Sequence, residues 1–182
     1  MNGSLNKDEL IALLDELSER LKRKNARASV YIVGGAAMAL AFDRSRTTHD
    51  IDGRIDAGHG ALIDSVHEIA RRRGLPTSWL NDQAVPRMPM ARDERARTVY
   101  TSEYLTVTGA SGEHILGMKL ESGRAFDQKD VNTLVEHLEI RNVEEGTGIH
   151  ERLFPHSRKR NRAQEMMEIA LKEIDPGPKD RQ

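Results

Sequence analysis

One stretch, residues 30–56, constrains what this chain can fold into more than any other: VYIVGGAAMALAFDRSRTTHDIDGRID. It begins with an apolar run, Val30 to Val33, that suits a buried strand, and Gly34 and Gly35 follow directly. An alanine-rich segment with high helix propensity comes next. The pattern predicts a strand that turns on two glycines into a helix, whose free N-terminal N–H groups can receive a phosphate.

The second half of the stretch is a polar loop that ends in Asp50-Ile51-Asp52. Alternate side chains of a strand share a face, so we expect Asp50 and Asp52 to project side by side. Two adjacent carboxylates repel each other unless a cation lies between them, and Mg²⁺ typically takes one or two carboxylates plus phosphate oxygens. A phosphate site and a metal site this close in sequence indicate nucleotide chemistry. The structural alternative is a tight turn followed by two exposed strand or loop residues.

Composition narrows the class of protein. The 182 residues hold 28 Lys and Arg against 29 Asp and Glu, which argues against a protein that coats nucleic acid by bulk charge. Two basic runs, 71–73 and 158–162, could still contact RNA phosphates, although charged helix ends are often simply solvated.

The absence of cysteine excludes disulfides and thiolate chemistry. With no signal core and no run of about 20 apolar residues, we expect a cytoplasmic protein without a membrane partner.

Hydrophobic periodicity predicts the remaining elements. Leucines at three- and four-residue steps favour a first helix over 7–24, capped by Asn6 or Ser4, and a second amphipathic helix is expected over 61–73. Residues 77–97 are expected to form a loop with one helical turn, and the β-branched segment 98–108 one or two strands. Further helices are expected over 113–122, over 128–140, and twice within 143–174, parted by Phe154-Pro155.

This order of elements predicts the α+β class, with a small mixed β-sheet core, an N-terminal helix and a helical C-terminal half. The expected domains are an α/β core over residues 1–110, a helical part over 111–174 packed on that core, and a flexible tail over 175–182.

Two motifs give the chain a family resemblance. An apolar strand, Gly34-Gly35, a helix and then Asp50-Ile51-Asp52 resemble the signature of the DNA polymerase β-type nucleotidyltransferase superfamily. The variant RTTHDID over 46–52 is most similar to the Abi-type (abortive infection) nucleotidyltransferases of bacteria. Residues 119–130, KLESGRAFDQKD, are similar to a downstream Lys-Leu-x-x-x-Arg-x-x-Asp-x-x-Asp pattern of those proteins.

The resemblance implies a set of site residues. They are Gly34, Gly35, Arg46 and Thr48 for nucleotide binding, Asp50 and Asp52 for Mg²⁺, and Asp50, Asp52, Lys119 and Asp127 for catalysis. By resemblance, Lys119 reaches the nucleotide phosphates, while Asp127 completes the active site or anchors Lys119. The alternatives are a snorkelling lysine and an aspartate that only caps a helix.

Many members of the superfamily place a third carboxylate on a later strand. In the segment 98–108 the only acidic residue is Glu103, which shares strand parity with Leu105 and Val107 and is therefore expected on the apolar face or past a bulge. The site then works with two carboxylates, or the protein binds nucleotide without transferring it.

The activity that the resemblance implies is Mg²⁺-dependent transfer of a nucleoside monophosphate from a nucleoside triphosphate to a hydroxyl of RNA or protein. The sequence leaves the nucleotide, the acceptor and the oligomeric state open. Similarity to Abi-type proteins implies a toxin–antitoxin setting, with tRNA or a partner protein as acceptor. The alternatives are a catalytically silent nucleotidyltransferase fold that acts as a binding partner or antitoxin, and an unrelated helical interaction protein.

Overall fold

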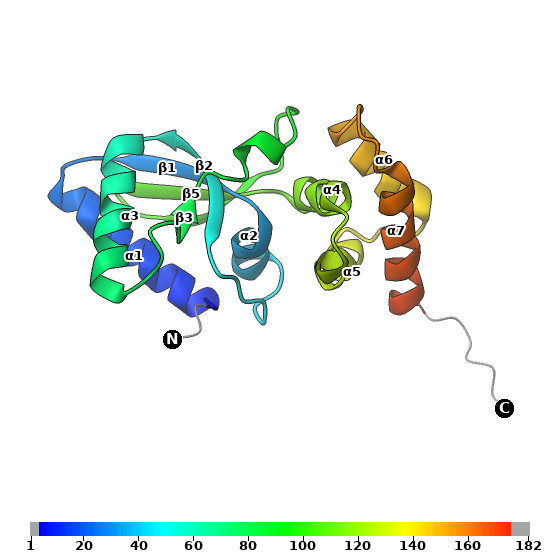
Figure 1. The fold of residues 1–182 in the computed structure, drawn as a ribbon, viewed down its shortest axis with the longest axis horizontal. Coiled ribbons are helices and arrows are strands. Elements are labelled where there is room, and N and C mark those ends of the chain that lie inside the picture. The colour runs from blue at the N-terminus through cyan, green and yellow to red at the C-terminus, as the bar shows by residue number, and fades with distance from the viewer. Residues whose placement is uncertain (1–3, 176–182) are drawn as a thin grey trace. The chain divides into compact units, whose positions relative to one another are not determined.

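The computed structural model describes residues 4–175, which divide into two compact units (Figure 1). Unit 1 comprises residues 4–88 and 94–110, and unit 2 comprises residues 89–93 and 111–175. A mixed sheet and several helices confirm the predicted α+β class. The tail expected over 175–182 lies, apart from Asp175, outside the described residues.

Unit 1 is built on a five-stranded sheet of order β3-β2-β1-β5-β4. Its strands are β1 (Ala28–Ile32), β2 (Ile51–Ala57), β3 (Leu80–Asn81), β4 (Arg97–Thr101) and β5 (Leu105–Gly109). The central strand β1 runs antiparallel to β2 and parallel to β5, while β2 pairs parallel with β3 and β4 pairs antiparallel with β5. Four of the five residues of β1 therefore pair with both of its neighbouring strands.

The helices of unit 1 follow the sequence pattern. They are α1 (Lys7–Arg23), α2 (Gly34–Ala41), α3 (His59–Arg73) and the 3₁₀ turn η1 (Val85–Arg87). Asn6, not Ser4, caps α1, because its side chain accepts from Glu9 N at 3.0 Å while Glu9 Oε2 accepts from Asn6 N at 2.8 Å. The leucine stripe of α1 is buried, and α1 packs beside α3 (Figure 1).

The register of the sheet assigns side chains to its two faces. Tyr31 pairs with Arg54 of β2 and with Thr108 of β5, so these three project from one face. Asp52, two residues before Arg54, belongs to the same face. The opposite face is apolar and packs against α1 and α3, and its buried residues include Val30, Ile32, Ile51, Leu105 and Val107. One face of the sheet thus makes the core and the other carries the polar groups.

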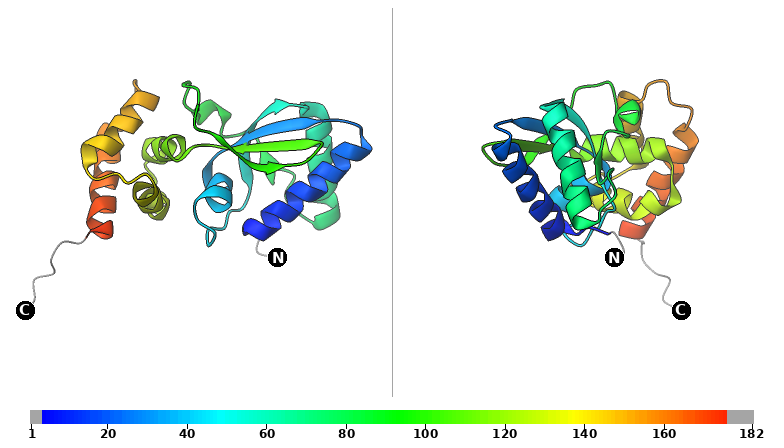
Figure 2. Two further views of the ribbon diagram at one scale, coloured as in Figure 1. Left: turned by 180° about the vertical axis from the view of Figure 1, so that it is seen from behind. Right: turned by 60° about the vertical axis from the view of Figure 1, so that its left-hand side comes forward.

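Unit 2 is helical. Its elements are α4 (Gly112–Ser122), the 3₁₀ turn η2 (Ala125–Asp127), α5 (Gln128–His137), α6 (Val143–Leu153) and α7 (Arg160–Ile174). Both α5 and α6 pack against α7, which the two views of Figure 2 show. Helix α5 ends three residues before the predicted Ile140, because Glu139 adopts a left-handed φ of 54°. Among the described residues, no helix combines the length and the apolar character needed to cross a membrane.

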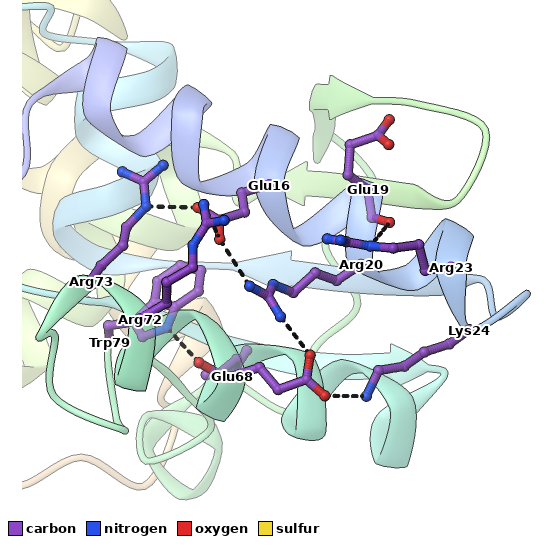
Figure 3. A network of polar contacts seen from close by, with 10 residues as sticks. Glu16, Glu19, Arg20, Arg23, Lys24, Glu68, Arg72, Arg73 and Trp79 are labelled. Carbon is purple, nitrogen blue, oxygen red and sulfur yellow. Dashed lines mark hydrogen bonds and ion pairs between the residues drawn. The ribbon is translucent and has the colours of Figure 1, made fainter.

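A shared carboxylate joins α1 to α3 (Figure 3). Glu16, whose side chain is 8% exposed, accepts from Arg73 at 2.7 Å and lies 2.9 Å from Arg72 and 3.4 Å from Arg20. Arg20 also meets Glu68 of α3 at 2.6 Å. Burial raises the pKa of Glu16, but the hydrogen bond and charge of Arg73, with Arg72 and Arg20, lower it below the ordinary value overall. Two of the arginines considered for RNA contact are therefore partners of a carboxylate.

We expect Glu16→Gln to lower the free energy of unfolding at neutral pH by about 1–3 kcal/mol, since it removes the anion that three guanidinium groups share. Folding lowers the pKa of Glu16, so this stabilisation is complete above the unfolded pKa of about 4.3 and is lost as the pH falls through the folded value. Urea unfolding of both proteins from neutral to acid pH measures the difference.

The control is Glu19→Gln on the same helix, because the Glu19 carboxylate points away from the arginines in Figure 3. We expect this control to be nearly neutral. Equal losses in the two variants, or a Glu16 effect that persists in acid, would contradict the role given to the shared carboxylate.

Candidate functional site

The turn from β1 into α2 has the predicted form. Val33 is the N-cap residue in an extended conformation, and Gly34 follows with a φ of 63°, a left-handed conformation that residues with side chains rarely adopt. Helix α2 then runs through buried Ala36 to Leu40. The amides of its first turn have no carbonyl one turn earlier to bond, so they are available in principle to an anion.

Asp52 lies beside this turn. Val33 N donates to Asp52 O at 2.9 Å, and a Cβ placed on Gly34 would lie 3.9 Å from Asp52 Oδ2. The half-buried Asp52 is the second residue of β2 and pairs with Asn81 of β3. The structure therefore brings the first glycine and the second aspartate together, although they are far apart in sequence.

Asp50 differs from the expectation of an aspartate pair within one strand. Strand β2 begins at Ile51, whose N–H bonds to Trp79 O at 2.7 Å, and Asp50 occupies a bend just before it. The Asp50 carbonyl accepts from Thr48 Oγ1 at 3.1 Å, and the residue is half-buried. Strand alternation thus places Asp52, while the preceding loop sets the position of Asp50.

The loop before β2 packs onto the second glycine. A Cβ on Gly35 would lie 2.6 Å from Thr48 Oγ1 and 3.9 Å from Arg46 Nη2. Thr48 is held in turn by an isolated β-bridge to Leu5, with N–H···O distances of 2.6 and 2.9 Å. Arg46 and Thr48 therefore lie at the start of α2. No sequence pattern pointed to Leu5, because its contribution is made entirely by backbone groups.

Glu103 lies at the wrong end of the sheet to supply a third carboxylate. It occupies the turn between β4 and β5, its side chain is 65% exposed, and it faces Arg27 at 3.7 Å. Strand β5 runs parallel to β1, so Glu103 lies near the start of β1, about 16 Å of strand from the turn at Gly34. Glu103 lies neither on the apolar face nor past a bulge within a strand, because it occupies the exposed turn. On the Asp52 face, β5 carries Thr106 and Thr108.

The donor set at this end of the sheet is small. Within residues 4–175, no cluster of three or more His, Cys, Asp or Glu side chains is arranged to hold a metal. Asp52 lies beside the turn, and Asp50 comes just before the strand that carries Asp52. Two carboxylates suit Mg²⁺ when phosphate oxygens and water complete its coordination, and they are too few for a metal site made of protein ligands alone.

Lys119 and Asp127 belong to a buried ion cluster in unit 2. Lys119 Nζ donates to Asp127 Oδ1 and, at 2.6 Å, to Asp130 Oδ2, and all three residues are buried. Ser122 Oγ donates to the other oxygen of Asp127 at 2.8 Å. A buried ammonium needs such partners to offset the loss of its hydration. This geometry favours the anchoring alternative for Asp127, and a catalytic role for Lys119 stays a prediction.

We expect Gly35→Ala to lower the free energy of unfolding by about 1–3 kcal/mol, because the new methyl group overlaps Thr48 and forces the loop to move. Gly60→Ala is the matched control: it lies in α3 with nothing within 4 Å of its added Cβ, so we expect a gain of up to about 1 kcal/mol. Thermal and denaturant unfolding measure both. A neutral Gly35→Ala would show that the loop does not pack as described.

We expect Lys119→Met to lower the free energy of unfolding by about 3–5 kcal/mol, since it leaves two buried carboxylates without their cation. Lys129→Met, at an exposed position on α5, is the control and should change stability little. Denaturant unfolding separates the two roles of Lys119. A variant that unfolds like the wild type but has lost activity would rule out anchoring as its main role.

One family of known proteins matches most of the chain. Residues 8–175 match the family described as "Nucleotidyltransferase of unknown function (DUF6036)". No curated protein matches the chain. Among solved structures, the chain is similar to an antigenic nucleotidyltransferase-like protein from Paracoccidioides brasiliensis, with 16% identity, coverage of 90% of this chain and 95% of that chain, and a TM-score of 0.40. The family match spans nearly the whole described chain, and the protein therefore belongs to this nucleotidyltransferase family.

Proposed function

We propose that the protein transfers a nucleoside monophosphate from a nucleoside triphosphate to a hydroxyl group of RNA or protein, with Mg²⁺ as cofactor. The observation that carries the proposal is the approach of Asp52 Oδ2 to within 3.9 Å of the position of a Cβ on Gly34. This approach puts a carboxylate next to a helix N-terminus. A nucleoside triphosphate with its bound cation needs both groups: a carboxylate to hold the cation, and amide donors to receive the phosphate oxygens.

Each residue of the site has a role in this proposal. The first-turn amides at Gly34 and Gly35 receive phosphate oxygens, and the absence of side chains lets the phosphates approach the backbone. Arg46 adds a guanidinium that pairs with phosphate oxygens, and Thr48 fixes its loop against Gly35. Asp52, with Asp50 at the strand entry, holds Mg²⁺.

The reaction is an in-line displacement at the α-phosphorus. The acceptor hydroxyl forms the new P–O bond and gives up its proton to water, the bond between the α-phosphorus and the oxygen that bridges to the β-phosphate breaks, and pyrophosphate leaves. Bound Mg²⁺ would neutralise phosphate charge and favour deprotonation of the hydroxyl. The residues of the chain hold the reactants in line and balance the developing charge, which supplies much of the acceleration in phosphoryl transfer.

A catalytically silent protein is the second candidate. It is supported by the chemistry of β5, where the positions on the Asp52 face are Thr106 and Thr108. A neutral threonine hydroxyl cannot act as the general base that a third carboxylate would supply, so nucleotide binding without transfer is the expected behaviour if two carboxylates do not suffice. Similarity of residues 46–52 and 119–130 to Abi-type proteins supports a toxin–antitoxin setting for either form.

We expect the wild-type protein, incubated with each labelled nucleoside triphosphate, Mg²⁺ and tRNA or cell lysate, to transfer label to an RNA or protein. We expect Asp52→Asn to reduce this transfer by about 100-fold or more, because the variant loses the charge that faces the glycine turn. Gel separation of the labelled products measures the transfer and identifies the acceptor class.

The control is Asp56→Asn. Asp56 lies further along β2 and is engaged by Arg54 at 2.7 Å, so its loss should leave transfer unchanged. Equal labelling by wild type and Asp52→Asn would reject the site. Mg²⁺-dependent nucleotide binding that Asp52→Asn weakens, with no labelled product from the wild type, would establish the silent alternative.

A further inference from the structure

An exposed aromatic ring marks the turn η2 of unit 2. Phe126 is 72% exposed, and within residues 4–175 the other large exposed hydrophobic residues, Val85 and Met90, are aliphatic. The Arg124 guanidinium lies over the Phe126 ring, 5.6 Å from its centroid. A cation on one face of the ring holds the side chain in place and leaves the planar system open to a ligand.

A second basic segment, distant in sequence, folds against this turn. Lys159 Nζ donates to Ser122 O at 3.3 Å, and Arg162 Nε donates to Gly123 O at 3.0 Å. Both bonds end on carbonyl groups just before Arg124. Together these segments form a surface that we call the Phe126 surface, whose members are Arg124, Phe126, Lys159 and Arg162.

The charge of the Phe126 surface is only partly balanced. Its three cations face two carboxylates. Arg162 lies 2.7 Å from Glu165. Burial raises the pKa of Glu121, but hydrogen bonds from Ser157 and His150 and the charges of His150 and Lys159 lower it below the ordinary value overall. Arg124 is exposed. Phe126 follows Gly123 by three residues, so its Cα lies at most about 11 Å from the Cα of Gly123, whose carbonyl accepts from Arg162.

We propose that the Phe126 surface binds single-stranded nucleic acid. An unpaired base stacks on the Phe126 ring, and Arg124, Lys159 and their neighbours contact the phosphates on either side. Stacking on an exposed aromatic residue beside a basic groove is the common physical basis of single-strand binding. A base that is paired in a duplex has no free face for the ring, so the surface selects single strands.

Two features favour nucleic acid over a membrane. Binding to a lipid surface through one element needs a continuous apolar face, and here a single apolar side chain stands among cations. Arg124 also covers part of the ring that a lipid contact would have to bury. The inference goes beyond the proposed transfer reaction, because this binding requires neither nucleoside triphosphate nor metal.

We expect the full chain to bind a fluorescent single-stranded RNA oligonucleotide, measured by fluorescence anisotropy without nucleotide or metal. We expect Phe126→Ala to weaken binding by about 5- to 150-fold through the loss of one stacked base. Phe126→Trp should retain binding. Phe126→Leu keeps an apolar side chain of similar size but no ring, so it should be as weak as alanine. The ring is exposed, and the thermal unfolding midpoint should therefore not change.

The charge contribution has its own readout. We expect Lys159→Gln to weaken binding and to lower the slope of log affinity against log salt by about 0.7 for each phosphate that the variant no longer neutralises. Lys172→Gln is the matched control, because Lys172 is an exposed cation on the same helix as Arg162 but outside the Phe126 surface. It should leave both affinity and slope unchanged.

Three results would overturn the proposal. The first is RNA binding that Phe126→Ala and Phe126→Leu leave intact, or no binding at all. The second is a duplex oligonucleotide bound as tightly as the single strand. The third is capture by vesicles of phosphatidylserine and phosphatidylcholine that depends on Phe126 while RNA does not bind. Since the assay contains no nucleoside triphosphate, failure here leaves the transfer proposal standing, and the reverse also holds.

Discussion

One backbone hydrogen bond, from Val33 N–H to the carbonyl of Asp52 at 2.9 Å, joins the two halves of the candidate site. It extends the β1–β2 ladder one step beyond the pair Ile32 and Gly53. A slip of one residue in this register would turn the Asp52 side chain onto the apolar face of the sheet. The register is held because Ile51, the neighbour of Asp52 on β2, must remain in the core on the opposite face. Core packing therefore determines where the carboxylate points.

The two glycines of the turn serve different needs. Gly34 has a left-handed backbone and ample space, whereas Gly35 has ordinary backbone angles and a Thr48 side chain where its own Cβ would be. The first makes the turn possible, and the second lets the loop close over the start of α2. Leu5 fixes that loop by its backbone bridge to Thr48, so the segment before α1 is part of the framework of the site.

Local pattern was enough for the longer elements and for the strand–glycine–helix turn, but it missed the short strand β3 within the segment 77–97 that was predicted to be a loop. The stripe at Leu10, Leu13 and Leu17 and the run of alanines after Gly35 each specify a local conformation that tertiary packing did not override. The sequence could not show the order and direction of the strands in the sheet. Alternation along β5 does not reveal that this strand runs parallel to β1, and only that direction removes Glu103 from the site.

The sequence also could not predict which charged residues pair when they are far apart in the chain. Arg73 is 57 residues from Glu16, and a basic run at a helix end looks the same in sequence whether or not a distant carboxylate meets it. The same limit applied to the Phe126 surface, since the bond between Arg162 and Gly123 spans 39 residues. A basic run in a sequence therefore does not by itself predict a surface with excess positive charge. The fold must first show which carboxylates pair with the run.

The helical unit uses charge in two physically distinct ways. Lys119 is buried, and a buried ammonium is tolerated only if carboxylates replace its hydration, which Asp127 and Asp130 do. The cations around Phe126 are mostly exposed, so water stabilises them and they need no full set of partners. The paired charges of the Lys119 cluster hold the helices together, whereas the mostly exposed cations around Phe126 remain available to a polyanion. Changes in the first group should act on folding and changes in the second on binding, so the two effects are separable by mutation within a single unit.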